Sequence, residues 1–367
     1  MRVLIAPDKF AGTLTAVEAA EAIAAGWAQQ APHDELDLAP MADGGPGFVD
    51  VVHAARGGEL RMLTCRGPLG EPVPATLLLV PDDAGPTAYV ESAQVCGLHL
   101  TSGQVEAAST VGVGDLLLAA LEAGATRVVV GLGGSGTNDA GAGLLAALGA
   151  TADRPLDRGV AGLAGVTRVE VPDAVRARLA GVDLVAATDV DIPLTGLFGA
   201  TKTFGPQKGL AEDRIAVVDG VLEEFAAATD RRLSLEKGAG AAGGLGHALL
   251  LLGAVREPGI ALVTTAVGLA DRARRADLVL TGEGAFDFSS RSGKVPYGVA
   301  QVAADALRPC VALAGQVLVG SREMRALGVE SAYACVDLVG EERSFADPAG
   351  SLRALAARVA RTWSPAP

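Results

Sequence analysis

Short apolar runs alternate with amphipathic segments along the last third of the chain. Strands are predicted at residues 260–263, 277–280, 310–314 and 331–336, and helices near residues 269–275, 297–307, 322–327 and 351–363. Strands that alternate with helices form a parallel sheet, because each crossover helix returns the chain to the same end of the sheet. This part of the chain is therefore expected to form a parallel α/β sheet.

The first sixty residues follow the same pattern. Residues 3–6 and 35–38 are predicted strands, and residues 48–55 a helix. Another helix is expected to begin after Thr15, whose spacing from Glu18 matches a capping box, and to run to Gln30. We therefore predict that this segment joins the C-terminal residues in one sheet.

The middle of the chain has a different character. Apolar runs at residues 77–80 and 88–91 are bounded by Pro, Gly and Asp, which favours a hairpin over a helical crossover. Further strands are predicted at 127–130 and 183–187, and helices at 114–123, 213–228 and 249–252. The predicted fold is therefore α/β: a doubly wound, flavodoxin- or Rossmann-like parallel sheet domain (residues 1–62 and 256–367) interrupted by a mixed α/β domain (residues 63–255).

Composition narrows the range of partners. The 367 residues carry 30 Lys and Arg against 43 Asp and Glu, a net charge of −13, which disfavours nucleic acid and anionic membranes as partners. No apolar run approaches the roughly 18 residues of a membrane helix, and the N-terminal apolar segment is too short for a signal peptide. The four cysteines are far apart, as expected for small core residues in a reducing compartment. A soluble, cytoplasmic protein is expected.

A glycine-rich turn follows the apolar run at 277–280. It carries Glu283, Asp287 and Lys294, and a predicted helix comes after it. Carboxylates suit a hard cation such as Mg²⁺, and an ammonium suits phosphate oxygens, so this turn is a candidate site for a magnesium-bound polyphosphate. The alternative is a tight turn whose charges are merely solvated.

A second glycine-rich loop, residues 131–139, follows the predicted strand at 127–130. Its Gly131, Gly133 and Gly136 fit the dinucleotide fingerprint, so a nicotinamide-dependent dehydrogenase is one alternative, although no strand ending in an acidic residue follows at the usual distance. The same loop fits a phosphate cradle, in which backbone N–H groups and side chains approach an anion. The residues proposed for that cradle are Gly133, Gly134, Ser135, Thr137 and Asn138, while Asp139 either binds a metal or caps the next helix.

Three further residues are candidates for catalysis. Asp189 ends a predicted buried strand and is placed to accept a substrate proton. Asp43, in a Gly-Gly loop at another strand end, could accept the proton instead or bind magnesium. Lys208 stands in a rigid turn, where it either acts on an anion or is simply solvated. Neither a Walker A motif nor a protein-kinase motif set is present, and the four histidines lack metal-binding spacing.

The order of these motifs resembles the bacterial type 1 glycerate kinase family. The resemblance rests on Ala6-Pro-Asp8, Ala42-Asp-Gly-Gly45, Gly131-Leu-Gly-Gly-Ser-x-Thr-Asn-Asp139, Ala187-Thr-Asp-Val190, Phe204-Gly-Pro-Gln-Lys-Gly209, Gly238-Ala-Gly-Ala-Ala-Gly-Gly244, Thr281-Gly-Glu-Gly-x-x-Asp287 and Gly293-Lys-Val-Pro296. It implies phosphorylation of D-glycerate by ATP with Mg²⁺, giving 2-phosphoglycerate rather than 3-phosphoglycerate. It also implies a two-domain α/β protein with its site in the interdomain cleft, and it allows a homodimer.

The resemblance suggests roles for individual residues. ATP phosphates are expected at residues 131–138, and at the later loop through Gly282 and Lys294, with Mg²⁺ held by Asp287 or Glu283. Asp189 is the expected base, with Asp43 as the alternative, and Lys208 is grouped with these catalytic residues. The substrate is expected near Asp8, Lys9, Gly44 and Gly45.

The chain departs from the family pattern at a few positions. The family usually has a lysine at the position of Ala11. In this chain the lysine stands two places earlier, at Lys9. Pro46, Ile192 and Ser289 replace a common glutamate, asparagine and glutamine. The changes at Pro46 and Ile192 remove polar groups that could contact the substrate, so they bear on the choice of substrate more than on phosphoryl chemistry. A hydroxy-acid dehydrogenase and a non-catalytic small-acid sensor remain the alternatives to a kinase.

Overall fold

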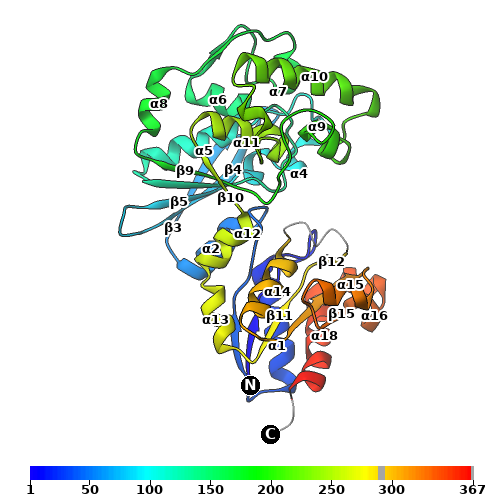
Figure 1. The fold of residues 1–367 in the computed structure, drawn as a ribbon. Coiled ribbons are helices and arrows are strands. Elements are labelled where there is room, and N and C mark those ends of the chain that lie inside the picture. Colours follow the sequence, from blue (N-terminus) through cyan, green and yellow to red (C-terminus); the bar gives the residue numbers. More distant parts are fainter. Residues whose placement is uncertain (288–293, 365–367) are drawn as a thin grey trace. The chain divides into compact units, whose positions relative to one another are not determined.

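The computed structural model describes residues 1–287 and 294–364. The chain divides into two compact units, which Figure 1 shows coloured along the sequence. Unit 1 comprises Met1–Asp43, Asp50–Arg56 and Ile260–Pro367, and unit 2 comprises Gly44–Val49 and Gly57–Gly259. Each unit has its own main sheet.

Unit 1 is built on a five-stranded parallel sheet. Its strands are β1 (Arg2–Ile5), β2 (Glu35–Leu38), β11 (Leu278–Thr281), β13 (Cys310–Ala314) and β15 (Ser331–Ala334), in the spatial order β15-β13-β11-β1-β2. Numbered by sequence within this sheet, the order is 2-1-3-4-5, the flavodoxin-like arrangement. The predicted parallel sheet of the terminal segments is thereby confirmed.

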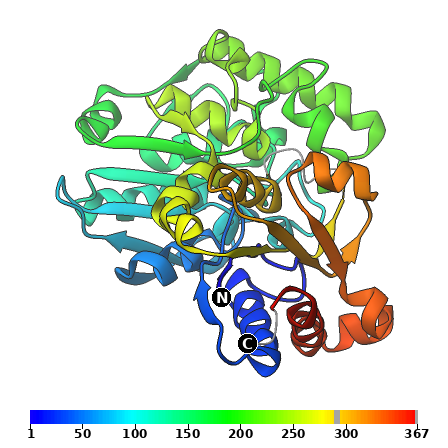
Figure 2. The same ribbon diagram turned by 60° about the horizontal axis from the view of Figure 1, so that its bottom comes forward.

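Helices cover both faces of this sheet. The helices assigned here are α1 (Ala16–Gln30), α2 (Phe48–Arg56), α12 (Gly259–Ala266), α13 (Leu269–Arg275), α14 (Val295–Asp305), α15 (Ser321–Ala326), α16 (Cys335–Val339), α17 (Glu341–Ala346) and α18 (Pro348–Trp363). Val3, Ile5 and their neighbours form one apolar cluster with α1 and α18, which lie side by side in both views (Figures 1 and 2). Leu4 and Val279 are equally buried on the other face, where α13 and α14 pack, because side chains alternate along a strand.

Unit 2 contains a mixed six-stranded sheet. Its strands are β3 (Glu59–Arg66), β4 (Pro72–Val80), β5 (Thr87–Glu91), β6 (Arg127–Gly131), β9 (Asp183–Ala187) and β10 (Val255–Glu257), in the order β10-β9-β6-β5-β4-β3. The pairs β3–β4 and β4–β5 are antiparallel, which confirms the predicted hairpin, and the remaining pairs are parallel. Consequently β5, β6 and β9 end at the same edge of the sheet.

The helices of unit 2 cover this sheet and carry its longest loops. They are α3 (Ala93–Cys96), α4 (Leu98–Thr101), α5 (Val111–Glu122), α6 (Ala142–Leu148), α7 (Gly159–Leu163), α8 (Asp173–Leu179), α9 (Ala200–Phe204), α10 (Glu212–Ala228) and α11 (Ala241–Leu251), with 3₁₀ turns η1 (Pro206–Lys208) and η2 (Leu233–Leu235). Short strand pairs complete the described elements: β7 (Thr151–Ala152) with β8 (Val169–Glu170) in unit 2, and β12 (Ala285–Phe286) with β14 (Gln316–Val317) in unit 1.

Some predicted elements were wrong. Residues 260–263 form part of helix α12 and not a strand, with only Val263 of these four residues fully buried. The predicted strand at 331–336 ends at Ala334, and α16 begins at Cys335. The apolar pattern also missed β3, and the expected domain boundary at residue 62 falls within that strand. The other expected boundary, at residue 256, falls within β10.

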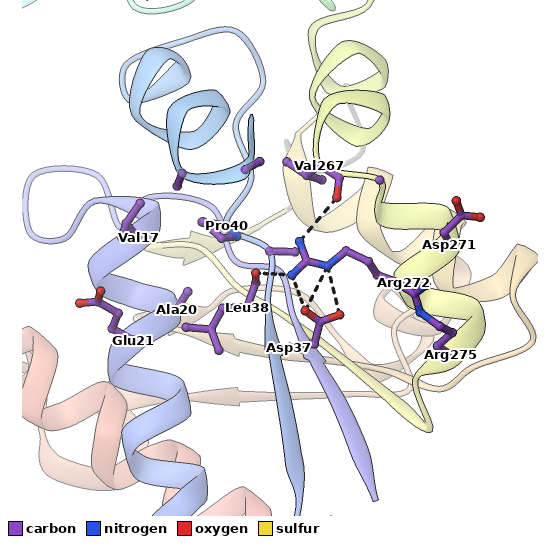
Figure 3. A pocket seen from close by; sticks show the side chains of 14 residues that line it. Val17, Ala20, Glu21, Asp37, Leu38, Pro40, Val267, Asp271, Arg272 and Arg275 are labelled. Atoms are coloured by element: carbon purple, nitrogen blue, oxygen red, sulfur yellow. Dashed lines mark hydrogen bonds and ion pairs between the residues drawn. The ribbon is translucent and has the colours of Figure 1, made fainter. Parts of the chain in front are cut away.

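An ion pair ties helix α13 to the edge strand β2 in unit 1 (Figure 3). The Nε atom of Arg272 donates to both carboxylate oxygens of Asp37, at 3.1 and 3.0 Å. Its Nη2 atom donates to Asp37 as well, and also to the carbonyl oxygen of Leu38, which lies 2.5 Å away. The pair lies in a cavity of about 600 Å³ between α1, α2, β2 and α13. Arg272 therefore covers part of a sheet edge that would otherwise be open to pairing.

No helix within residues 1–287 and 294–364 is long and apolar enough to cross a lipid bilayer.

Candidate functional site

The loops after β1 and β11 bring the candidate residues of unit 1 together. These strands are neighbours at the point where the strand order reverses, which is where open α/β sheets bind ligands. The backbone N–H of Asp8 donates to the carbonyl of Gly282 at 2.8 Å, and the Thr281 hydroxyl donates to the carbonyl of Ala6 at 3.0 Å. The first loop is thus held against the loop that carries Glu283.

Lys9 lies between two carboxylates. Its Nζ atom is 3.6 Å from Oδ1 of Asp8 and 3.8 Å from Oδ1 of Asp43. Burial raises the pKa of Asp8 to about 7, since it removes the carboxylate from water; Lys9 opposes this effect, and Asp43 and Glu283 add to it. The expected substrate residues Asp8 and Lys9 therefore lie in one charged cluster with Asp43, and Lys9 faces the carboxylates while Ala11 is exposed.

Lys294 approaches the two carboxylates proposed for Mg²⁺. Its Nζ atom is 3.5 Å from Oε2 of Glu283 and 3.7 Å from Oδ1 of Asp287. Among residues 1–287 and 294–364, no group of three or more acidic, His or Cys side chains is arranged to bind a metal. A pair of carboxylates still fits Mg²⁺, which commonly takes one or two carboxylates and completes its shell with water and phosphate oxygens. Ser289 and Gly293 lie outside the described residues.

The glycine-rich loop after β6 packs against the segment at 44–46. The N–H of Gly133 donates to the carbonyl of Gly44 at 3.1 Å, and a Cβ placed at Gly133 would lie 2.5 Å from the Cα of Gly45. A Cβ at Gly134 would lie 2.7 Å from Cδ of Pro46. Glycine is therefore required here by close contact with the backbone of Gly45 and the ring of Pro46, a reason that the motif alone did not reveal.

Glu91 was not among the predicted residues, yet it positions this segment. Its Oε2 accepts hydrogen bonds from the N–H groups of Gly47 at 3.0 Å and Val49 at 3.4 Å, at the start of α2. The residue is 7% exposed and is the last residue of strand β5. The sequence offered only one signal for this role, a carboxylate at the end of a strand. The hydrogen bond itself could not be predicted, because Gly47 lies 44 residues earlier in the chain.

Lys208 is buried, contrary to the alternative of a solvated turn. Its side chain reaches from η1 to the loop after β6, where Nζ donates to Oγ of Ser135 at 3.0 Å and to the carbonyl of Thr137 at 2.7 Å. Burial lowers the pKa of Lys208 to about 8, because it disfavours the charged form. A cavity of about 300 Å³ adjoins it, lined by Gly133, Gly134 and Ser135 together with Leu98, Leu132, Val190, Phe204, Gln207 and Ala242.

The remaining polar residues of this loop lie behind the cavity. Asn138 is 1% exposed and donates from Nδ2 to Oγ1 of Thr201 at 2.9 Å, and Thr137 is fully buried. Asp139 accepts hydrogen bonds from Thr110 and from the N–H groups of Gly141 and Gly143 at the start of α6. The N-cap position of α6 itself is Gly141, so Asp139 holds the N–H groups at the start of this helix from two residues earlier.

Asp189 follows strand β9 and is half-buried. The next residue, Val190, lines the same cavity as Lys208. Asp189 and Lys208 therefore lie at the same edge of the sheet. Asp191, by contrast, is exposed and paired with Arg256 and, at 3.3 Å, with Lys237. The candidate residues therefore fall into two groups. Unit 2 contains Asp189, Gly44, Gly45, residues 133–138 and Lys208. Unit 1 contains Lys9 and Lys294 with the carboxylates of Asp8, Asp43, Glu283 and Asp287.

The structural context of a dinucleotide fingerprint is not formed. After the loop at 131–139 and helix α6, the next strand is the two-residue β7, which pairs antiparallel with β8 in a separate sheet. The parallel neighbours of β6 are β5 and β9. A Rossmann-type βαβ unit requires the strand after the helix to join the same parallel sheet, so these glycines do not mark a nicotinamide site.

Comparison with known proteins agrees with the motifs. Residues 3–364 match the sequence model of the glycerate kinase family. Glycerate kinase of Bacillus subtilis (strain 168) is 39% identical, with 92% of this chain and 90% of the relative covered. Glycerate 2-kinase of Escherichia coli (strain K12) is 37% identical, with 93% and 92% covered.

One solved structure extends the agreement to three dimensions. A crystal structure from Salmonella typhimurium LT2, assigned to glycerate kinase 2, superposes with a TM-score of 0.80 at 34% identity and covers 99% of this chain and 98% of its own. The resemblance drawn from the motifs is confirmed. The chain is thus a member of the glycerate kinase family of enzymes.

Proposed function

We propose that the protein transfers a phosphoryl group from ATP to D-glycerate with the help of Mg²⁺, and that the product is 2-phosphoglycerate. The observation that carries the proposal is the buried Lys208 beside the cavity of unit 2. An ammonium in such surroundings calls for an anionic partner, and both substrates are anions. The choice of the 2-hydroxyl is supported by the relative named glycerate 2-kinase.

Lys208 retains capacity for an anion. An ammonium has three N–H bonds, and among the described residues two of them are directed at Ser135 and Thr137. The third is available to a carboxylate or phosphate oxygen in the adjoining cavity. In this position the fixed positive charge would offset the negative charge on the transferring phosphoryl group.

Asp189 is the proposed base. It would accept the proton of the glycerate hydroxyl as that oxygen bonds to the γ-phosphorus and the bond from this phosphorus to the bridging oxygen of ADP breaks. Lys9, held by Asp8 and Asp43, would bind the glycerate carboxylate. Glu283 and Asp287 would hold Mg²⁺, which supplies further charge neutralisation to the phosphates, and Lys294 would turn to the phosphate oxygens.

The test is ADP release from ATP and Mg²⁺ with a panel of acids: D-glycerate, L-glycerate, glycolate, lactate and a four-carbon hydroxy acid. We expect release with D-glycerate above the rate without acid, and phosphorus NMR should place the phosphate on the 2-hydroxyl. Release of ADP with none of these acids would contradict the proposal. Binding of glycerate without turnover would indicate a sensor instead, and an acid-dependent change in NADH absorbance without ATP would indicate a dehydrogenase.

A further inference from the structure

A small, uncharged pocket adjoins the carboxylate loops of unit 1. Its volume is about 210 Å³, and Phe10, Ala11, Ala285, Gln316 and Phe345 are among its lining residues. All of its lining residues lie in the described part of the chain, and none of them is charged. Pockets for whole drug-sized ligands measure about 300–1,000 Å³, so this pocket fits a single ring system.

Two other cavities differ from this pocket in their electrostatics. In unit 2, the cavity of about 300 Å³ adjoins the buried ammonium of Lys208, which suits an anion. The larger cavity of unit 1 is lined by several charged side chains, of which Arg272 and Asp37 form an ion pair; the others are Glu21, Asp271 and Arg275. The uncharged pocket is therefore the better match for the uncharged part of a ligand.

The walls of the pocket come from the loops that carry the charged residues. Phe10 and Ala11 directly follow Lys9, and Ala285 stands between Glu283 and Asp287. A ligand whose charged groups lie at Lys294 and whose rings lie in the pocket would thus be held by one continuous structure. A nucleoside triphosphate has this division into a charged and an uncharged end.

The pocket also has the chemistry for a flat heterocycle. Phe345, on α17, is 58% exposed although it lines the pocket, so its ring offers a face for stacking, while Phe10 is buried at 4% exposure. Gln316 carries an amide, which supplies a hydrogen-bond donor and an acceptor. We propose that this pocket holds the purine base of ATP, an assignment that rests on the proposed kinase function.

Isothermal titration of ATP and of inorganic tripolyphosphate, both with Mg²⁺, tests the assignment. Loss of base–aromatic stacking weakens binding by about tenfold or more. Phe345→Ala should therefore weaken ATP binding by about tenfold and leave tripolyphosphate binding unchanged. Phe198→Ala, which removes another exposed phenyl group, is the matched control and should leave both affinities unchanged.

A second variant fills the pocket instead of trimming it. Ala11 is exposed at the pocket, so Ala11→Leu should fold normally, as thermal melting will show, and should also weaken ATP but not tripolyphosphate. ATP affinities equal to the wild-type value in both variants would overturn the assignment, even if the wild type releases ADP with glycerate. A wild type that binds ATP through this pocket but releases no ADP with any acid would contradict the kinase proposal and leave the pocket assigned.

Discussion

The Nζ atom of Lys208 lies 2.7 Å from the carbonyl oxygen of Thr137, 71 residues earlier in the chain. This hydrogen bond and a second one to Ser135 fasten the turn at 206–208 to the loop after β6. The same loop is fixed on its other side by the Gly133–Gly44 hydrogen bond. A positive charge is thereby held at a defined place beside the cavity of about 300 Å³.

The charge of Lys208 should make anion binding depend on pH. Because burial lowers its pKa to about 8, the ammonium should lose its proton as the pH rises through that value. We expect the affinity for ATP or for D-glycerate to fall between pH 7 and 9.5, measured by calorimetric titration. Lys208→Arg keeps its charge over this range and should flatten the profile. Affinities for both ligands that stay constant in the wild type would contradict the prediction.

The depressed pKa of Lys208 should also make the stability of the fold depend on pH. The folded-state pKa lies below the value of about 10.4 expected in the unfolded chain, so the stability associated with this group is complete above pH 10.4 and is lost as the pH falls toward 8. The wild type should therefore lose stability as the pH is lowered from about 10 to 8, whereas Lys208→Met, which cannot take up a proton at this position, should not. The free energy of unfolding of the variant minus that of the wild type should increase over this range. Urea denaturation across this range measures the difference. A difference independent of pH would argue against a depressed pKa.

Asp189→Asn should lower kcat by roughly 10²–10⁴-fold with little change in thermal stability, since a general base contributes about that factor. The matched control is Asp191→Asn, two residues later, whose carboxylate is exposed and paired with Arg256 and Lys237. The control should retain kcat within a few-fold. Near-normal turnover in Asp189→Asn would transfer the role of base to another carboxylate, with Asp43 the next to test.

Asp287→Asn should raise the Mg²⁺ concentration required for half-maximal activity by about tenfold or more, because one of two anionic ligands is lost. Glu341→Gln, on α17, removes an acidic charge elsewhere in unit 1 and serves as the control. The measurement is ADP release against Mg²⁺ concentration at fixed ATP. An unchanged Mg²⁺ requirement in Asp287→Asn would remove this residue from the metal site.

Gly133→Ala and Gly220→Ala should have opposite effects on stability. The Cβ added by Gly133→Ala would lie 2.5 Å from the Cα of Gly45, so the loops must separate, at a cost of about 1–3 kcal/mol. Gly220 lies within α10, and a Cβ there would meet no atom within 4 Å, so alanine should stabilise the helix by about 0.5–1 kcal/mol. Chemical denaturation of both variants checks the sign. Equal effects would show that the contact with residues 44–46 is not tight.

Local signals predicted much of the secondary structure. The capping box of Thr15 and Glu18 is present at the start of α1, because both of its hydrogen bonds join residues three apart. The apolar runs at 277–280 and 310–314 form β11 and β13 at the centre of the sheet. Residues 260–263 show the limit of such signals, since a short apolar run fits a strand and a partly buried helix equally well.

The sequence by itself determined the α/β class, most strands and the family, because these depend on residue order and short-range periodicity. It also placed carboxylates and glycines at strand ends. Only the tertiary structure decided that Lys208 is buried, that Glu91 holds the segment at 44–49, and that Gly133 and Gly134 face Gly45 and Pro46. Each of these depends on atoms from residues more than forty positions apart, and burial and contact at that separation are set by how the chain packs.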